Sequence, residues 1–568
     1  MRAAREPGIE MRGVLRRSAR RDAAGREAGP LTRLQHGADV ETALLFAVFR
    51  GHSSSFDTPA LAGKTGRVGN AASLRHNPAM HIVHVAPEMT PYAKVGGLGE
   101  VLGSLPVAQR RDGHRVTVIL PGYHRVMDSA GLWGEAWGET RYLAGGQDLS
   151  GSLYRFEHDG VDVIAIWQPR FFDRQGIYGE ARGSFEDNAD RFGWFSGAAL
   201  NTARLLDPPP DVVVSHDWPS ALVPVYLRAH PQADDPLSRT ASVFVIHNLA
   251  HQGVFPRGSA GRLNLPELWL DRDGLGSGAQ LNFVKGAIRA ATLLVTVSPT
   301  YAKQVLTPAH GRGLDADLRA RGNDLFGILN GLDTATWNPE TDPHLPAHYN
   351  ADDLAGKLEC KVALQRDLGL RVDPALPLFG IVSRIDAQKG IDLVGRAAST
   401  LVGRSGQLVL LGTGQPSLLD ELRGIARHWR QSVVLIETFD EMIAHRIYAA
   451  ADFFLMPSRF EPCGLGQLVA LRYGTPPIVH RTGGLADTVS DADAEPERGN
   501  GLVFDHPDAD GVRWATERAL TMFHEEPDRL ERLRHRGMSE DLSWDRSAGE
   551  YERVLELAVL RERRRVMS

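Results

Sequence analysis

The sequence predicts an α/β protein built from open parallel sheets in at least two domains. With 568 residues the chain is too long for one compact core, so two or three domains are expected. Short apolar runs typical of buried strands, such as Ile82 to Ala86 and Leu378 to Val382, are each followed by a loop and a helical pattern. Polar or charged residues come directly after several of these strands, where parallel sheets bind ligands.

The composition is that of an ordinary globular protein, with 42% hydrophobic and 24% charged residues. Cys360 and Cys463 are the only cysteines, which predicts no disulfide framework and a reducing compartment. No apolar run reaches the roughly 18 residues that a membrane helix needs. We therefore expect a soluble, cytoplasmic protein with no membrane partner.

The first 79 residues carry a different charge from the rest of the chain. They contain 13 Lys and Arg against seven Asp and Glu, a net charge of +6 in a chain whose total is −6. Basic arms occur in nucleic-acid-binding proteins and in targeting segments. The seven acids argue against nucleic-acid binding, and the apolar run ETALLFAVF lies too far from the N-terminus to belong to a signal peptide. We expect residues 1–79 to be a basic extension, disordered or mis-annotated, and predict no nucleic-acid partner.

The loop after the first predicted strand is rich in glycine and carries Lys94. A strand, a glycine loop and a helix together make a phosphate-binding unit. Gly97, Gly99 and Gly103 approach a dinucleotide fingerprint, but their spacing is GxGxxxG. No acid follows the next strand (116–120) to hold a ribose, so NAD binding is disfavoured. Without other evidence Lys94 would be interpreted as a solvated surface lysine.

Two consecutive strands each end in a histidine with a hydrogen-bonding partner. The segment DVVVSHDW delivers His216 and Asp217, and ASVFVIHN delivers His247 and Asn248. With His251 these residues include enough metal-capable side chains for a metal site. The ligands would come from separate strand ends rather than one helix face, so a metal site is disfavoured, and histidines at strand ends are usually structural.

The second half of the chain places two cations and one acid after predicted strands. Arg384 and Lys389 follow the strand 378–382, and such a pair suits a departing diphosphate. Glu461 follows the strand-like segment 452–456, where a phosphorylated ligand would lie, before Gly464 and a resumed helical pattern. The alternatives are two solvated cations and an acid that favours a helix dipole.

Residues 171–196 combine aromatic and acidic side chains, and the sequence FFDRQGIYGEARGSFEDNADRFGWFS indicates a polar loop. Aromatic faces stack on sugar rings while carboxylates hydrogen-bond sugar hydroxyls. The loop is expected either to line a carbohydrate groove or to be a mobile surface segment. The acid pairs Asp315/Asp317 and Asp491/Asp493 have the spacing of a metal-binding DxD motif, but we expect them to be solvated.

Four ordered motifs closely resemble those of bacterial glycogen synthases and plant starch synthases, retaining glucosyltransferases of family 5 with the GT-B fold. They are KVGGL (94–98), HNL (247–249), SRIDAQKG (383–390) and FEPCGL (460–465), the last within a longer similar stretch that runs from PSRFEPCGL through YGTPP to TGGLADTV (457–489). The resemblance covers nearly all of residues 80–568. It implies two Rossmann-like, doubly wound domains that face a central cleft, and a C-terminal helix that crosses back to the first domain.

This resemblance also implies the domain limits. An N-terminal, acceptor-side domain is expected over 80–335 and a nucleotide-sugar domain over 336–540, with a hinge near 330–345. The crossing helix is expected over 541–568, with an apolar face at Tyr551, Val554, Leu555, Val559 and Leu560.

For the site, the resemblance implies that Arg384 and Lys389 neutralise the leaving diphosphate. Glu461 and His247 would bind the glucosyl unit, and Glu461 with the backbone carbonyl beside His247 would support its oxocarbenium-like centre. Tyr178 and Asp173 would belong to a loop near the acceptor. The implied donor-site residues are Lys94, Gly96, Gly97, Asp217, Asn248, Phe439, Cys463, Gly464 and Leu465.

The implied reaction moves glucose from ADP-glucose to an α-1,4-glucan such as glycogen, with no cofactor and no metal. The chain departs from the family at Gly99-Glu100 (Ala-Asp in relatives), Phe439 (often Tyr) and Gly466 (usually Thr). Alternatives that remain open are another retaining GT-B enzyme that uses UDP-glucose, a non-catalytic glucan-binding relative, and a metal-dependent transferase that uses the acid pairs.

Overall fold

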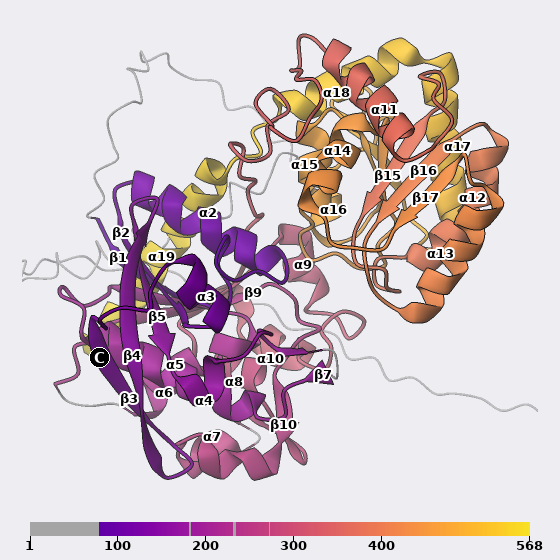
Figure 1. The fold of residues 1–568 in the computed structure, drawn as a ribbon. Helices are drawn as coiled ribbons and strands as arrows, with labels where there is room; N and C mark the ends of the chain where they lie inside the picture. The colour runs from indigo at the N-terminus through magenta and orange to yellow at the C-terminus, as the bar shows by residue number, and fades with distance from the viewer. Residues whose placement is uncertain (1–78, 181–182, 231–233, 272, 568) are drawn as a thin grey trace, which may run out of the picture.

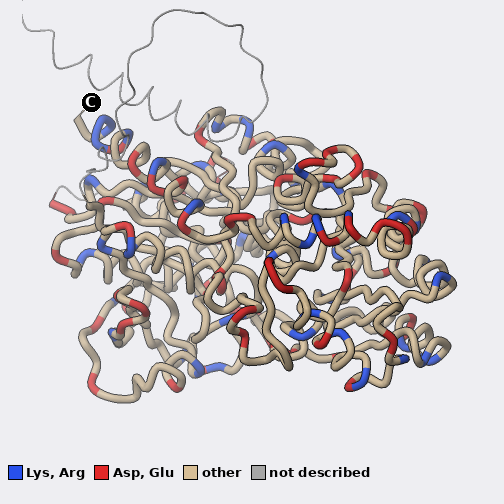
Figure 2. Tube along the Cα trace, turned by 90° about the horizontal axis from the view of Figure 1, so that it is seen from above, with Lys and Arg blue, Asp and Glu red and all other residues tan. Residues whose placement is uncertain are grey.

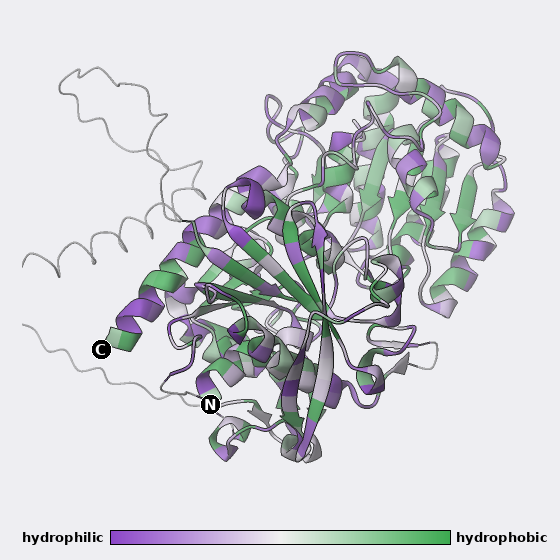
Figure 3. Cartoon of the chain, turned by 60° about the vertical axis from the view of Figure 1, so that its left-hand side comes forward, coloured by the Kyte–Doolittle hydropathy of each residue, from purple (hydrophilic) through white to green (hydrophobic). Residues whose placement is uncertain are grey.

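The computed structural model describes residues 79–567, except 181–182, 231–233 and 272, and it contains two parallel sheets in successive halves of the chain (Figure 1). The expectations for residues 1–78 lie outside the described residues. The strands are the most hydrophobic segments of both halves, and many helices are hydrophilic on their outer faces (Figure 3). The GT-B architecture is confirmed by these two sheets and the returning C-terminal helix.

The first sheet has nine strands in the order β14-β13-β9-β8-β1-β2-β5-β4-β3. It is parallel except that β4 runs antiparallel to both β3 and β5. Its strands are β1 (His81–Val85), β2 (Arg115–Pro121), β3 (Gly138–Ala144), β4 (Gln147–His158), β5 (Val161–Trp167), β8 (Val212–His216), β9 (Ala241–Ile246), β13 (Leu293–Thr296) and β14 (Leu325–Gly327).

Helices cover this sheet, and the shorter strands of this half form two small separate sheets, β10-β12-β11 and β6-β7. The helices are α2 (Gly97–Arg111), α3 (His124–Ser129), α4 (Pro169–Phe172), α5 (Asn188–Arg204), α6 (Leu222–Ala229), α7 (Glu267–Leu270), α8 (Phe283–Ala290), α9 (Pro299–Gln304) and α10 (Asp315–Ala320). The short strands are β6 (Gly179–Glu180), β7 (Gly183–Ser184), β10 (Val254–Pro256), β11 (Gly276–Ser277) and β12 (Gln280–Asn282).

The second sheet has six strands, all parallel, in the order β17-β16-β15-β18-β19-β20. They are β15 (Leu378–Val382), β16 (Gln407–Leu411), β17 (Val433–Ile436), β18 (Phe453–Met456), β19 (Pro477–His480) and β20 (Leu502–Phe504). The helices of this half are α11 (Ala355–Asp367), α12 (Ile391–Gly403), α13 (Pro416–His428), α14 (Glu441–Ala450), α15 (Gly466–Arg472), α16 (Gly483–Thr488), α17 (Ala509–Glu525) and α18 (Pro527–Ser539).

Each sheet reverses its direction of winding once. In the first sheet the reversal lies between β1 and β8, and in the second between β15 and β18. At such a point the loops leaving the two strands turn to opposite faces of the sheet and open a crevice at the carboxyl ends. The strand order therefore predicts one ligand-binding edge in each half.

The segment 171–196 is not the polar loop that the sequence indicates. Its last part is the beginning of α5, and the rings of Phe172, Phe192, Trp194 and Phe195 are buried in the core. Arg191 is buried among them, where it donates hydrogen bonds to backbone carbonyls of the preceding loop. These aromatic rings cannot stack on a sugar, because they pack against one another instead.

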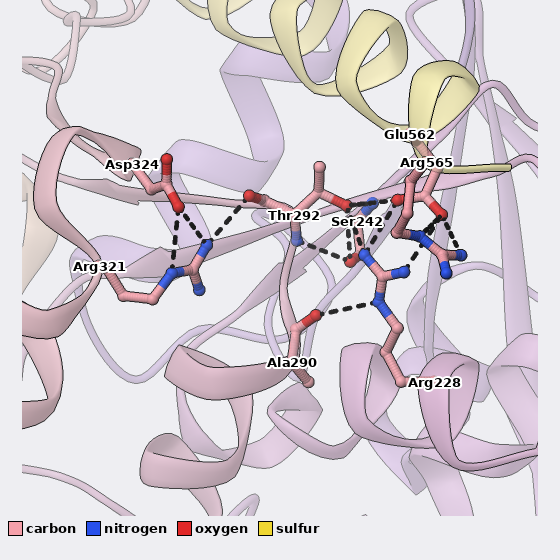
Figure 4. A network of polar contacts seen from close by, with 8 residues as sticks. All are labelled: Arg228, Ser242, Ala290, Thr292, Arg321, Asp324, Glu562 and Arg565. Atoms are coloured by element: carbon pink, nitrogen blue, oxygen red, sulfur yellow. Dashed lines mark hydrogen bonds and ion pairs between the residues drawn. The ribbon is translucent and has the colours of Figure 1, made fainter. Parts of the chain in front are cut away.

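The C-terminal helix α19 (Trp544–Met567) returns to the first half and packs against α2, β8 and β9, as expected (Figure 1). Tyr551, Val554 and Leu555 are buried in this contact. Near its end, Glu562 accepts hydrogen bonds from Nη2 of Arg228 at 2.9 Å and from Oγ1 of Thr292 at 3.2 Å (Figure 4). Only 3% of the Glu562 side chain is exposed, so a charged pair is enclosed where the helix ends.

Glu562→Gln is expected to lower the free energy of unfolding by about 2 kcal/mol, because the partly buried Arg228 loses its counter-charge. Arg563→Ala is the matched control, since its guanidinium pairs with Asp211 at 3.2 Å on the exposed face of the same helix. That change should cost about 0.5 kcal/mol or less. Urea unfolding of both variants measures the difference, and equal losses would contradict the role given to Glu562.

Candidate active site

A cavity of about 630 Å³ lies between the two halves of the protein, and its walls come from both. One wall is formed by the loops after β1, β8 and β9, and the other by the loops after β15 and β18. The cavity thus connects the reversal points of the two sheets. Most residues that the sequence predicted for the site line it: Gly96, Gly97, Asp217, His247, Asn248, Arg384, Lys389, Glu461, Cys463, Gly464 and Leu465.

Lys94 and Phe439 do not line this cavity. The Lys94 ammonium pairs with the carboxylate of Glu100 and lies 3.6 Å from Oε1 of Glu441, in the other half. The Phe439 ring is 78% exposed, with Nζ of Lys94 6.0 Å from its centroid. The two residues therefore approach each other across the halves. Asp173 is also outside the cavity, on the surface beside His124.

Glu461 and Lys389 form the central charged contact of the C-terminal wall. Nζ of Lys389 lies 2.5 Å from Oε2 of Glu461, which also accepts a hydrogen bond from Oγ of Ser458 at 3.1 Å. Glu461 is only 6% exposed. Arg384 contributes a second cation, but its side chain is 58% exposed and lies 3.0 Å from Oδ2 of Asp386. The wall therefore offers one enclosed cation and one at the opening.

Two glycines determine how closely the loops of this wall approach. Gly390 has φ +69°, and a Cβ atom there would lie 2.1 Å from the carbonyl oxygen of Pro457. Gly483 has φ +46°, and a Cβ atom there would lie 1.9 Å from the carbonyl oxygen of Glu461. Only glycine fits either position. The glycines of the QKG and TGGL sequences are thus required to hold Lys389 and Glu461 together.

Asp217 organises the opposite wall. Its Oδ1 accepts hydrogen bonds from the backbone N–H groups of His247 at 2.8 Å and Asn248 at 3.4 Å, so it fixes the loop after β9. Its backbone has φ 54° and ψ −178°, a region almost restricted to glycine, and strain of this kind clusters at functional sites. Burial raises the pKa of Asp217 to about 7, although the two N–H groups favour the ionised form.

Glu88 is a cavity residue that the sequence did not single out. Its carboxylate accepts hydrogen bonds from Oη of Tyr178 at 2.5 Å and from the backbone N–H groups of Val95 and Gly96 at 2.7 and 3.1 Å. Burial raises the pKa of this carboxyl group. Its position just after β1 is the signal that could have found it, because the other site residues follow strand ends in the same way.

The residues considered for metal binding have other partners. Asp315 pairs with Arg319, and Asp317 pairs with Arg289. Asp491 is buried against Arg518, which corrects the expectation that it is solvated. Across the described part of the chain, no three or more His, Cys, Asp and Glu side chains are arranged to hold a metal ion.

Cys463 has no chemical role in this arrangement. Burial raises the pKa of its thiol to about 12, so it stays protonated at neutral pH and is a poor nucleophile. It fills space in the cavity wall.

Comparisons with known proteins agree with this geometry. The family model "Starch synthase catalytic domain" matches residues 81–320, and "Glycosyl transferases group 1" matches residues 377–522. "Glycogen synthase 2" of Geobacter sulfurreducens is 42% identical over 480 residues, which cover 84% of this chain and 99% of the relative. "Glycogen synthase" of Anaeromyxobacter sp. is 45% identical over 478 residues, covering 83% and 98%.

Solved structures give the same result. The catalytic domain of Starch Synthase IV from Arabidopsis thaliana, bound to ADP and acarbose, superimposes with a TM-score of 0.78 and 37% identity. The match covers 85% of this chain and 99% of that one. Sucrose-phosphate synthase from Thermosynechococcus elongatus, at 18% identity and a TM-score of 0.53, shares the fold alone.

The raised pKa of Asp217 predicts a pH-dependent stability. Between its ordinary value of 3.8 and about 7, the folded protein binds more protons at this site than the unfolded chain does. Rising pH in this window therefore lowers the free energy of unfolding. Asp217→Asn removes this proton binding. As the pH rises through the window, the free energy of unfolding of the variant should therefore increase relative to that of the wild type, by at most about 1.4 kcal/mol per pH unit.

Urea unfolding of both proteins at several pH values from about 4 to about 7 measures this gain. The comparison cancels the contributions of the histidines, which titrate in both proteins. If the free energies of unfolding of the two proteins change in parallel with pH, the raised pKa of Asp217 is contradicted.

Proposed function

Because the chain belongs to the starch and glycogen synthase family and is a glycosyltransferase, we propose that its donor is ADP-glucose and its acceptor an α-1,4-glucan such as glycogen. The glucosyl unit passes to the non-reducing 4-hydroxyl with retention at C1. The observation that supports this most is the cavity between the halves, where the cations of one wall face the histidine and amide of the other. ADP as the nucleotide is favoured because the similar starch synthase was solved with ADP.

Arg384 and Lys389 bind the diphosphate and stabilise its charge as it leaves. A guanidinium offers a planar fork of donors, and an ammonium offers a compact point charge, so the two complement each other on neighbouring phosphates. Fixed cations that face a developing negative charge are effective because they need no reorganisation during the reaction. They supply what a divalent ion supplies in other transferases, and the proposal includes no metal and no cofactor.

Glu461 and His247 hold the glucosyl unit from opposite walls. The Glu461 carboxylate accepts hydrogen bonds from sugar hydroxyls and stabilises the positive charge that develops at C1. Glu88 and Asp217 also line the cavity, but both use carboxylate oxygens to hold backbone N–H groups. Neither is placed to form a covalent intermediate, so transfer on one face of the sugar is the step that fits.

The remaining partners follow from charge and composition. Among the described residues, no helix combines the length and apolar character needed to cross a membrane. Lys and Arg are interspersed with Asp and Glu over the trace rather than collected in one stripe (Figure 2). We propose no nucleic-acid partner. A cytoplasmic location is proposed from the two cysteines, both free and buried.

Arg384→Ala is expected to lower kcat/KM for glucose transfer about a hundredfold or more, since it removes a cation from the leaving group. The matched control is Arg423→Ala, an exposed arginine of the same half that pairs with Glu437 and Asp420 and does not line the cavity. Release of ADP from ADP-glucose in the presence of glycogen is the readout. Transfer that survives Arg384→Ala but stops in EDTA would favour a metal-dependent reaction.

The choice of nucleotide is tested by donor competition. Glycogen is incubated with equal amounts of ADP-, UDP- and GDP-glucose, and the released nucleotides are separated and measured. ADP is expected to predominate. Release mainly of UDP would reject the proposed donor while leaving the glucan acceptor in place, and no release would indicate a glucan-binding protein without transferase activity.

A further inference from the structure

A file of four hydrogen-bonded side chains leads from the cavity into the core of the first half. Nε2 of His247 lies 3.0 Å from Nδ1 of His216, and Nε2 of His216 lies 3.0 Å from Nδ1 of His84. Nε2 of His84 lies 2.7 Å from Oε1 of Gln109, in the last turn of α2. His84 and His216 are fully buried and Gln109 is 1% exposed, so water does not interrupt the file.

The three imidazoles are neutral. Burial lowers the pKa of His84 to about 4 and that of His247 to about 3. Burial also lowers the pKa of His216 well below its ordinary range, and the two flanking histidines add to this effect. A neutral imidazole has one N–H donor and one acceptor nitrogen. Each hydrogen bond of the file needs one hydrogen, so all three rings must donate in the same direction along it.

The orientation of the Gln109 amide decides that direction: Oε1 faces His84, and Nε2 is buried without a hydrogen-bond partner among the described residues. Oε1 can only accept, and therefore His84 carries its hydrogen on Nε2 and presents a bare Nδ1 to His216. His216 then donates from Nε2 to His84, and His247 donates from Nε2 to His216. The remaining nitrogen, Nδ1 of His247, carries no hydrogen. His247 lines the cavity, and no hydrogen bond to this nitrogen is formed by the described residues.

We propose that Gln109 is a positioning residue for the transfer reaction. Acting through His84 and His216, it holds His247 in the tautomer whose Nδ1 accepts a hydrogen bond from a hydroxyl of the transferred sugar. With the opposite direction of the file, His247 would present an N–H and donate to the hydroxyl oxygen, so the hydroxyl hydrogen would no longer be held by the ring. The sugar assignment rests on the proposed function, whereas the direction of the file does not.

Neutron diffraction from crystals of the perdeuterated protein tests the direction without any substrate. The expected map has deuterium on Nε2 and none on Nδ1 in His84, His216 and His247. Deuterium on Nδ1 of His247, alone or with Nε2, would overturn the proposal. Because this measurement uses the unchanged chain, it holds even if variants fold poorly.

Gln109→Met tests the consequence for catalysis. Methionine has a similar length but does not set the direction of the file, so the reactive tautomer becomes only part of the population. We expect kcat to fall about two- to tenfold while KM for ADP-glucose changes little, and the neutron map to show deuterium shared between both nitrogens of His247. No change in kcat would overturn the role of Gln109.

Gln365→Met is the matched control, because it removes a buried amide of α11 that donates to Oε1 of Gln407 and to the Asp373 carbonyl. Gln365 belongs to the other half of the chain and does not line the cavity. It should leave kcat unchanged at a similar loss of thermal stability. An equal fall of kcat in both variants would mean that Gln109 acts only through stability and would overturn the proposal. A wild-type protein that transfers no glucose would reject the proposed function but not the direction of the file.

Discussion

Two reversals of strand order, one in each parallel sheet, determine where this protein can bind a ligand. Between β1 and β8, and again between β15 and β18, the connections leave on opposite faces and expose the carboxyl ends of the strands. The halves are arranged so that both edges open into one cavity. The site depends on this arrangement, because Arg384, Lys389 and Glu461 come from one edge and Asp217 and His247 come from the other.

Contacts between the halves maintain the arrangement on one side of the cavity. Oγ1 of Thr300 and its backbone N–H donate to Asp487, which joins α9 to α16, and Oγ of Ser298 donates to the carbonyl of Pro462 beside Glu461. The backbone of the same loop packs directly against Gly483, where a side chain would not fit. Glu461 is therefore placed by contacts from both halves. Movement of the halves about residues 330–345 stays a prediction.

Local patterns were enough to predict the elements that carry the site. The strand 378–382 has the predicted bounds, and Arg384, Lys389 and Glu461 follow strands as expected, because buried parallel strands are continuous apolar runs. The helix at 188–204 was missed because its aromatic and charged residues are mixed in sequence and separate only when it packs.

Long-range contacts were not predictable from such patterns. Glu88 depends on Tyr178, 90 residues away, and the histidine file joins residues up to 132 positions apart. Lys94 was placed in the site by its motif, yet in the structure its ammonium is held by Glu100 and Glu441. A motif identifies the loop, whereas the direction of a side chain depends on charges that come from elsewhere in the chain.

The most direct test of this account is a crystal structure of the protein with ADP and a malto-oligosaccharide bound. The account predicts the diphosphate against Arg384 and Lys389, at the reversal point of the six-stranded sheet, with the oligosaccharide end between Glu461 and His247. A diphosphate bound instead at the carboxyl edge of the nine-stranded sheet, away from both cations, would contradict it.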